Sequence, residues 1–351
     1  TDKSTNTAIP GEDSSFAMID GDSYQTIHYL GGDVKTMLTG RLFLPFGHQT
    51  AAKSPMIVLA TGLGLVQDYS LDPYVTAFQK AGFAAFTFDY RTFGLSDGYP
   101  RHQVKPQRHV EDLKATLKMI HARSKTSLSM IDVNRIGLWG TSLGGGHVLM
   151  TATAAANDLS GILAPRAVVA QVPHVRSATE SVIGTVLRDP VNGTIGLLKF
   201  LGAVVKAGVS AIVSGKPLYI PLCGRPGDPA MMQNPGDHEG YLSLTKRNSK
   251  DDGDWRNLAT VGSGLATLVY RPMNHVANIR APTLLIGAER DTLCPAGDSQ
   301  DAANIILKGE YVSIPNLGHF DIYDGEALRQ ILKITIVFFH KHLLLITASE
   351  R

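Results

Sequence analysis

The stretch that decides the fold runs from Arg135 to Gly146 and reads RIGLWGTSLGGG. Its core, GTSLG, fits G-x-S-x-G, a pattern in which a nucleophilic serine sits on a sharp turn between a strand and a helix. The residues RIGLW predict a strand before Ser142, and GGGHVLMTATAAA predicts a helix of small residues after it. Glycines suit both sides of such a turn because the strand and the helix pass each other closely. The stretch therefore predicts an α/β fold with Ser142 as its nucleophile.

A second match to the same pattern, GLSDG, lies at residues 94–98 and centres on Ser96. This serine also follows an apolar run, but Asp97, Gly98, Tyr99 and Pro100 come next. Gly98 and Pro100 favour a loop and disfavour the start of a helix. We therefore expect Ser96 to be a loop residue and Ser142 to be the nucleophile.

Apolar runs alternate with helical patterns from Pro55 onward. Strands are predicted at 55–60, 83–89, 135–139, 167–171, 282–287 and 311–315, and helices at 73–82, 107–123, 145–157, 296–307 and 325–342. Upstream, Tyr24–Tyr29 and Val34–Leu44 predict two antiparallel edge strands. Strand–helix alternation is typical of a mostly parallel sheet flanked by helices. The predicted fold class is therefore α/β.

The alternation stops between residues 173 and 278, where helices and turns are predicted. We interpret this region as a helical lid or cap inserted into a core of residues 24–172 and 279–351, with residues 1–23 as a flexible N-terminal tail. The insertion carries an apolar group that predicts either a wall for a hydrophobic acyl chain or the ordinary packing of an inserted subdomain: Leu197, Leu198, Phe200, Leu201, Val204 and Val205.

Composition narrows the classes of partner. The 33 Lys and Arg residues nearly balance the 31 Asp and Glu residues, which disfavours a nucleic-acid partner. The most apolar region, residues 193–222, is interrupted by Lys199, Lys206 and Lys216, so we expect amphipathic cover and no membrane span. Two widely spaced cysteines, Cys223 and Cys294, predict no disulfide framework and a reducing, cytoplasmic location. The sequence leaves the oligomeric state open.

A serine hydroxyl needs a base to accept its proton and an acid to orient that base. In a sheet of this topology the acid follows a later strand and the histidine a still later one. Asp291 follows PTLLIG and His319 follows YVSIP, in the required order. Glu289 is the rival acid. Asp321 and His147 are more typical of capping or packing residues, so we predict Ser142, His319 and Asp291 as the catalytic triad.

An acyl-transfer site also needs donors for the oxyanion. We predict the backbone N–H of Leu143, directly after the serine, and that of Leu63 in the loop Thr61–Gly62–Leu63–Gly64. An ordinary glycine turn is the alternative for Leu63. The sequence contains no P-loop, no H-E-x-x-H and no G-x-G-x-x-G after a strand, so no metal and no organic cofactor are predicted.

The chain resembles the α/β-hydrolase superfamily over residues 24–342. Within it, the chain resembles the fungal group named after polyketide transferases, related to Xaa-Pro dipeptidyl-peptidase-like and dienelactone-hydrolase-like proteins. The motifs that carry the resemblance are FDYRTFGLSDGYPR (88–101), GLWGTSLGGGHVL (137–149), LYIPLCGRPGDPAMM (218–232), Trp255-x-Asn257 and Tyr270–Arg271–Pro272. The resemblance implies that GLSDG is a loop after the fourth strand, beside the active site. Thr61–Gly62 stands where the superfamily usually has His–Gly.

These observations predict a serine hydrolase that cleaves an ester or thioester of a hydrophobic, polyketide-like acyl group through an acyl-enzyme. The resemblance implies a role in natural-product biosynthesis and a small-molecule or carrier-bound acyl substrate. An acyltransferase or cyclase would use the same triad while excluding water. A peptidase is a further alternative, and a non-hydrolytic binding or cyclising protein is the alternative from a different class.

Overall fold

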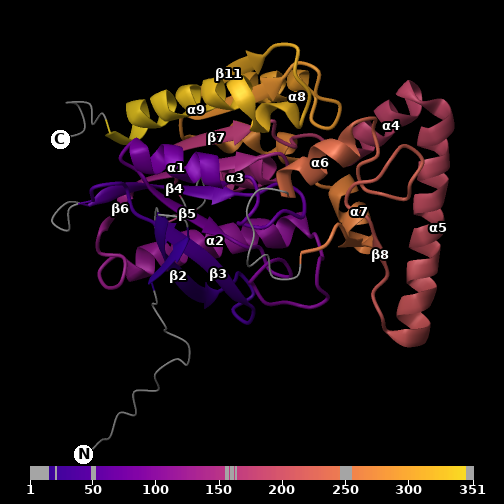
Figure 1. Ribbon diagram of the computed structural model, residues 1–351, viewed down its shortest axis with the longest axis horizontal. Coiled ribbons are helices and arrows are strands. Elements are labelled where there is room, and N and C mark those ends of the chain that lie inside the picture. The colour runs from indigo at the N-terminus through magenta and orange to yellow at the C-terminus, as the bar shows by residue number, and fades with distance from the viewer. Residues whose placement is uncertain are drawn as a thin grey trace, which may run out of the picture.

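The computed structural model describes residues 16–19, 22–48, 53–154, 158, 162, 164–245 and 255–344. A nine-stranded sheet runs through these residues, in the order β1-β2-β3-β5-β4-β6-β7-β10-β11 (Figure 1). The strands are β1 (Phe16–Ile19), β2 (Asp22–Leu30), β3 (Met37–Phe43), β4 (Ser54–Ala60), β5 (Ala84–Phe88), β6 (Ile131–Thr141), β7 (Ala167–Gln171), β10 (Thr283–Ala288) and β11 (Gly309–Ile314).

The sheet is mostly parallel. Strands β5, β4, β6, β7, β10 and β11 pair in parallel, whereas β1, β2 and β3 are antiparallel to their neighbours. All residues of β4, β5, β7 and β10 are buried, as expected for parallel strands covered on both faces. The predicted α/β class is confirmed. All these parallel strands point their carboxyl ends at one edge, where the loops that carry the predicted site residues meet.

The boundary predicted for the N-terminal tail is wrong. The tail was expected to extend to residue 23, but β1 pairs with β2 in an antiparallel register that runs from Phe16 opposite Gln25 to Ile19 opposite Asp22. The sheet therefore begins at Phe16, and β1 takes the edge position predicted for the next strand. A four-residue strand is too short to show a period, and only its pairing with β2 reveals it. Residues 1–15, 20 and 21 of the predicted tail lie outside the described residues.

Helices cover the two faces of the sheet. Helix α1 packs against α9 on one side, and α2 packs against α3 on the other (Figure 1). The core helices are α1 (Asp72–Lys80), α2 (Pro106–Arg123), α3 (Leu143–Ala154), α8 (Ala296–Ile305) and α9 (Gly325–Phe339), the last continuing as a π-helical turn (His340–Leu344), with a short 3-10 turn at Asp321–Tyr323. Apolar spacing predicted α2, one side of which is buried, whereas α3 was predicted from its small residues and is buried on nearly all sides.

The segment between β7 and β10 lies at one end of the sheet (Figure 1). Its helices are α4 (Ala178–Arg188), α5 (Pro190–Ser214), α6 (Asp237–Thr245) and α7 (Val261–Leu268), with 3-10 turns at Pro272–Asn274 and Val276–Asn278. It also contains a small antiparallel sheet of β8 (Tyr219–Ile220) and β9 (Ala259–Thr260), which the sequence pattern did not predict. Strands of two residues carry no periodic signal.

One described stretch, Pro190–Ser210 in α5, is long and apolar enough to cross a membrane by length and composition alone. Core helices of soluble proteins can have the same length and composition. Only 11% of this stretch is buried inside the protein, so α5 lies mostly at the surface.

Candidate active site

Ser142 occupies the single position between β6 and α3. Its φ is 55°, in the left-handed region that is strained for a residue with a Cβ. The turn depends on neighbouring glycines: a Cβ on Gly144 would lie 2.3 Å from the Thr61 carbonyl oxygen, and one on Gly140 would lie 2.4 Å from the Gly144 carbonyl oxygen. The GTSLG pattern thus has a steric cause, because the start of α3 passes directly beside β4 and β6.

Ser142, His319 and Asp291 converge at the carboxyl edge of the sheet. The Ser142 Oγ lies 3.0 Å from Nε2 of His319, and Nδ1 of His319 lies 2.6 Å from Oδ2 of Asp291. The other carboxylate oxygen of Asp291 accepts hydrogen bonds from the backbone N–H groups of Leu293 and Cys294, at 2.8 and 2.7 Å. A carboxylate fixed in this way orients the imidazole, so that Nε2 is available to accept the Ser142 proton.

The electrostatics of His319 are dominated by burial and by Asp291. Burial by itself lowers the pKa of His319, but the charge of Asp291, the neighbouring Cys294 and hydrogen bonds to both raise it. The net result is a pKa well above the ordinary value for histidine. An imidazole in this environment is a strong proton acceptor, which suits the general base of a covalent mechanism.

The two rival carboxylates have other partners in the loop that carries His319. Glu289 Oε2 accepts a hydrogen bond from the Asn316 N–H at 2.7 Å, and Asp321 Oδ2 accepts one from the Gly318 N–H at 2.8 Å. Both side chains therefore brace the backbone just before His319. His147 is buried in α3, where its Nδ1 lies 2.9 Å from the Tyr270 hydroxyl, as predicted for a packing residue.

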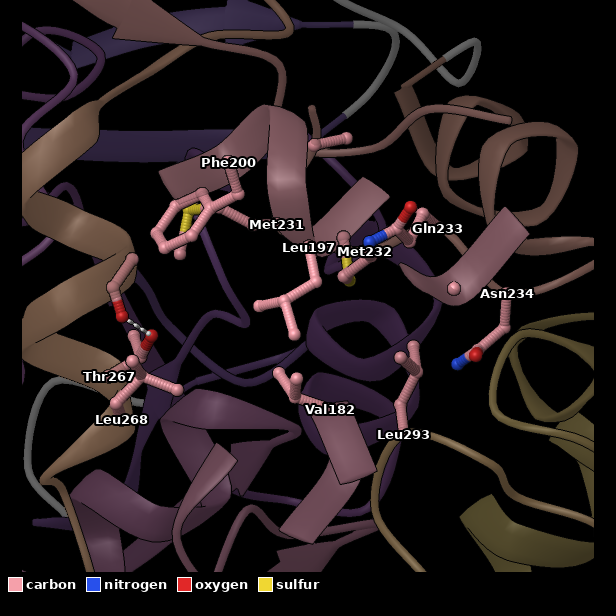
Figure 2. Close-up of a pocket in the computed structure, with 13 residues that line it drawn as sticks. Val182, Leu197, Phe200, Met231, Met232, Gln233, Asn234, Thr267, Leu268 and Leu293 are labelled. Atoms are coloured by element: carbon pink, nitrogen blue, oxygen red, sulfur yellow. Dashed lines mark hydrogen bonds between the residues drawn. The ribbon is translucent and has the colours of Figure 1, made fainter. Parts of the chain in front are cut away.

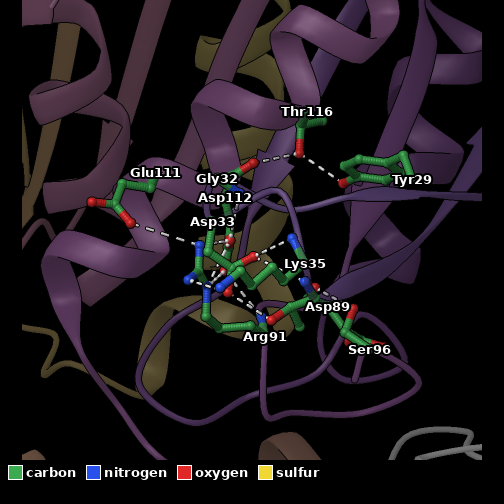
Figure 3. Close-up of polar contacts among 11 residues, drawn as sticks. Tyr29, Gly32, Asp33, Lys35, Asp89, Arg91, Ser96, Glu111, Asp112 and Thr116 are labelled. Carbon is green, nitrogen blue, oxygen red and sulfur yellow. Dashed lines mark hydrogen bonds and ion pairs between the residues drawn. The ribbon is translucent and has the colours of Figure 1, made fainter. Parts of the chain in front are cut away.

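The rival serine, Ser96, is buried in the loop after β5. Its Oγ donates to the Asp89 carbonyl oxygen at 2.7 Å and accepts from the Thr39 N–H at 2.9 Å. In the same loop, Arg91 forms an ion pair with Asp112 of α2 at 2.5 Å and with Asp33 at 3.1 Å (Figure 3). These contacts tie the loop to α2 and to the β2–β3 turn, so the GLSDG segment has a structural role in this fold.

The two predicted oxyanion donors, Leu63 and Leu143, line the same cavity as Ser142. Neither backbone N–H donates a hydrogen bond to another described residue. Leu143 is the first residue of α3, where unpaired N–H groups and the helix dipole favour a negative charge. Thr61, which replaces the usual histidine, donates its hydroxyl to the Leu65 carbonyl oxygen at 3.1 Å and so closes the loop that presents Leu63.

An apolar cavity of about 80 Å³ opens beside Ser142. It shares Met231, Met232, Thr267 and Leu293 with a second cavity of about 100 Å³ under the lid helices. Figure 2 shows Leu197 of α5 pointing toward Val182 of α4 across this second cavity, with Phe200 next to Met231. The two cavities form an apolar space that begins at the serine and extends into the insertion.

The six apolar residues singled out on α5 do not share one role. Leu197 and Phe200 line the second cavity, which we call the inner cavity. Leu198, Leu201 and Val205 are 63%, 48% and 69% exposed, so these three form neither a wall for an acyl chain nor part of a packed subdomain core. Val204 is half-buried and lines neither cavity. A helix turns by about 100° per residue, and adjacent apolar residues therefore face different sides.

Sequence reasoning missed two polar residues that line the cavity beside Ser142, His174 and Cys294. His174 follows β7 in the same way that Asp291 follows β10, which was the available signal. Burial lowers the pKa of His174 to about 4, so its ring is neutral at pH 7. Burial raises the pKa of the Cys294 thiol, which favours its protonated form.

Cys223 and Cys294 are both free and buried. Asn257 brackets Cys223: its Oδ1 accepts from the Cys223 N–H at 3.0 Å, and its Nδ2 donates to the Cys223 carbonyl at 2.8 Å. The Trp255-x-Asn257 motif thus fastens one part of the insertion to another. Among the described residues, no three His, Cys, Asp or Glu side chains converge as metal ligands. The cytoplasmic location stays a prediction.

Comparisons with known proteins place this geometry in a family. Residues 54–190 match the Hydrolase_4 family, described as "Serine aminopeptidase, S33". The chain is 34% identical to the quorum-quenching protein AidA of Acinetobacter baumannii, over 83% of this chain and 88% of that protein. It is 26% identical to the polyketide transferase af380 of Aspergillus fumigatus, over 83% and 91% of the two chains, and other relatives are named thiohydrolases.

Among solved structures, that of DcsB in complex with its substrate analogue covers 92% of this chain and all of its own, with a TM-score of 0.72 and 22% identity. At this identity the likeness concerns the fold. The identity to AidA over most of both chains establishes the family. The chain is therefore a serine hydrolase of the α/β-hydrolase superfamily, related to AidA, to fungal polyketide transferases and to thiohydrolases.

Proposed function

We propose that the protein cleaves esters or thioesters of apolar acyl groups, with Ser142 as the covalent nucleophile. The observation that carries the proposal is the hydrogen-bonded series Ser142–His319–Asp291 at the mouth of an apolar cavity. An apolar wall selects a hydrophobic acyl chain, and an activated serine at its end attacks the carbonyl carbon of that chain.

In the proposed reaction, the Ser142 oxygen bonds to the carbonyl carbon while its proton passes to Nε2 of His319. The N–H groups of Leu63 and Leu143 stabilise the oxyanion. As the bond to the leaving group breaks, His319 returns the proton to the departing alcohol or thiol. Water, activated by the same imidazole, then releases the acid and restores Ser142. Asp291 keeps its charge throughout and stabilises the imidazolium.

The size of the cavities makes the proposal specific about chain length. Volumes of about 80 and 100 Å³ are small beside the roughly 300–1,000 Å³ of typical small-molecule sites. A short acyl chain fits without rearrangement, whereas a long chain requires α4 and α5 to move apart. We therefore expect kcat/KM to vary with chain length, with a penalty for chains that extend beyond Met231 and Met232.

A series of p-nitrophenyl esters and N-acetylcysteamine thioesters of increasing chain length tests the proposal. Val182→Phe narrows the inner cavity and should lower kcat/KM selectively for the longer chains. Its matched control is Ile183→Phe, because Ile183 is the next residue of α4 and is 55% exposed. Equal effects of the two variants at every chain length, or a rate on aminoacyl-proline amides that exceeds the rate on every ester, would refute the acyl-chain assignment.

Transfer to an acceptor other than water is the second candidate, favoured by the apolar, lid-covered surroundings of Ser142. An acyl-enzyme on Ser142 is common to both reactions. The ratio of transferred to hydrolysed product, measured with an added alcohol, amine or thiol, separates them. Transfer is supported if the acceptor product dominates at an acceptor concentration far below that of water, and hydrolysis is supported otherwise.

A further inference from the structure

Helix α5 exposes a continuous apolar stripe along its outer side. Figure 1 places α5 at the edge of the molecule, beside α4 at one end. Six of its exposed aliphatic side chains recur mostly at alternating intervals of four and three residues and are 41% to 79% exposed: Val191, Ile195, Leu198, Val205, Val209 and Val213. A seventh, Leu201, is 48% exposed and lies beside this stripe. Alternating four-three spacing is the pattern of a helix that packs along a second helix.

Gly202 fills the gap in this stripe between Leu198 and Val205. Glycine in the middle of a helix costs up to about 1 kcal/mol relative to alanine. At Gly196 the protein itself explains the glycine, because a Cβ there would lie 1.9 Å from Oε1 of Gln233. At Gly202, as at Gly208 of the same helix, a Cβ would meet no described atom within 4 Å. Of these two glycines only Gly202 lies in the stripe, where the missing Cβ would let a partner backbone cross α5 closely.

The stripe is nearly symmetric about Gly202. Val191 and Val213 lie eleven residues before and after it, Ile195 and Val209 lie seven, and Leu198 and Val205 lie four and three. Two copies of α5 that cross antiparallel about a two-fold axis at Gly202 would bring each residue against its symmetric counterpart. In a two-fold interface every contact occurs twice, so such self-complementary spacing is what the symmetry requires.

The charges of α5 predict opposite effects of salt for a second helix and for an anionic lipid surface. The helix contains Lys199 and Lys206 on one edge of the stripe and no acidic residue. Lys199 Nζ donates to the Gly227 carbonyl oxygen at 2.8 Å, which keeps this side chain against its own protein. In an antiparallel pair the lysines of both copies would line the same side and repel one another weakly. Salt would therefore strengthen pairing, whereas it weakens binding to an anionic membrane.

We propose that α5 pairs with α5 of a second copy of this chain, antiparallel, with the two Gly202 residues at the crossing point. The stripe from Val191 to Val213 extends over roughly 33 Å at 1.5 Å per residue. The inner side of the same helix contributes Leu197 and Phe200 to the cavity. Pairing on the outer side therefore fixes the helix that forms the inner wall of the lid.

Engineered cysteines test the crossing point. Gly202→Cys should form a disulfide-linked dimer under mild oxidation, since the two residues face each other across the axis. The control is Gly208→Cys: Gly208 is also exposed in α5 with no described atom within 4 Å of a built Cβ, but it lies about 240° around the helix. Both native cysteines are buried. Equal cross-linking of the two variants would overturn the proposal.

The direction of the helices has its own test. A mixture of Ile195→Cys and Val209→Cys should cross-link to each other, while Ile195→Cys alone should not. In an antiparallel pair the two copies of residue 195 lie about 21 Å apart along the helix axis. Cross-linking of Ile195→Cys alone, without the mixed product, would indicate a parallel pair and overturn the antiparallel proposal.

Sedimentation equilibrium of the unmodified protein measures the association itself. We expect a dimer that tightens as salt is raised, and a monomer with an unchanged Tm for Val205→Glu. A monomer at every concentration, or a dimer that Val205→Glu leaves intact, would overturn the proposal. Flotation of a monomeric protein with phosphatidylserine vesicles would assign the stripe to a membrane surface instead. None of these readouts depends on the chemistry of Ser142.

Discussion

The hydroxyl of Tyr241 in α6 donates a hydrogen bond of 2.6 Å to the backbone carbonyl oxygen of Leu63. The insertion is thereby joined directly to the loop that presents a predicted oxyanion donor. A second bond of the same kind follows one residue later, where Trp255 Nε1 donates to the Gly64 carbonyl oxygen at 2.8 Å. Two side chains of the insertion therefore hold the loop that contains Leu63 and Gly64.

Tyr241→Phe should lower kcat roughly fivefold with little change in KM. The variant removes one hydrogen bond, worth about 1 kcal/mol, from the loop that holds the Leu63 N–H. Steady-state kinetics with a p-nitrophenyl ester measures the effect. The control is Tyr90→Phe, because Tyr90 is equally buried and its hydroxyl has no partner among the described residues. An unchanged kcat for Tyr241→Phe would exclude a positioning role.

Ser142→Ala should reduce ester hydrolysis by about 10⁴-fold or more, because covalent catalysis is lost while the cavity and the oxyanion donors remain. Labelling by a fluorophosphonate should disappear in parallel, as intact-protein mass spectrometry would show. Ser96→Ala is the control for the second G-x-S-x-G match and should retain labelling. Labelling of Ser142→Ala at another serine would contradict the assignment.

The activity should decline at acidic pH, with an inflection above the ordinary histidine value of about 6.5. His319 acts as a base only when neutral. Burial lowers its pKa, but the charge of Asp291 outweighs burial and raises it, so protonation sets in at a higher pH than for an isolated histidine. Asp291→Asn removes that charge, which should move the inflection of kcat/KM to lower pH and reduce kcat by about 10⁴-fold.

The matched control is Glu289→Gln, because the Glu289 carboxylate accepts a hydrogen bond from the Asn316 N–H rather than from the imidazole. Its pH profile should keep the inflection of the unmodified protein. A shift in this variant together with none in Asp291→Asn would reassign the triad acid to Glu289.

Protein stability should fall below pH 6.5 because of buried, neutral histidines. His109 stacks on Tyr90 with ring centroids 4.3 Å apart, and burial lowers its pKa to about 3. The unfolded chain binds a proton near pH 6.5 whereas the folded protein does not, so His109 stabilises the fold above pH 6.5 and this contribution is lost as the pH falls toward 3. The loss is about 1.4 kcal/mol per pH unit within that window.

His109→Phe keeps an aromatic ring beside Tyr90 and removes the titrating group. Urea unfolding between pH 4.5 and 7.5 should show a shallower dependence of the unfolding free energy on pH for this variant. His275→Gln changes an exposed histidine and serves as the control. Identical slopes for all three proteins would show that His109 does not contribute to acid sensitivity.

Local sequence predicted much of the core. The strand before Ser142, the small residues after it and the order of Ser142, Asp291 and His319 were readable because each is encoded by neighbours in the chain. Parallel strands bring their carboxyl ends to one edge, so the order of the loops also predicts which side chains can meet. The structure brings these three side chains within hydrogen-bond distance of one another.

Only the tertiary structure decided the residues whose position depends on a distant partner. Strand β1 is recognised only by its pairing with β2. The contribution of Tyr241 is recognised only by its hydrogen bond to Leu63, 178 positions away in the chain. Helix α5 shows most clearly what sequence periodicity cannot predict. It is apolar on two sides, and periodicity alone cannot say which side faces the cavity. Packing against Val182 and Met231 turns Leu197 and Phe200 inward and leaves the stripe through Gly202 outside. The sequence by itself thus determined most of the sheet and the order of the predicted catalytic groups, because short-range sterics and hydrophobic periodicity encode them. The lid contacts were decided by long-range packing, which no local pattern records.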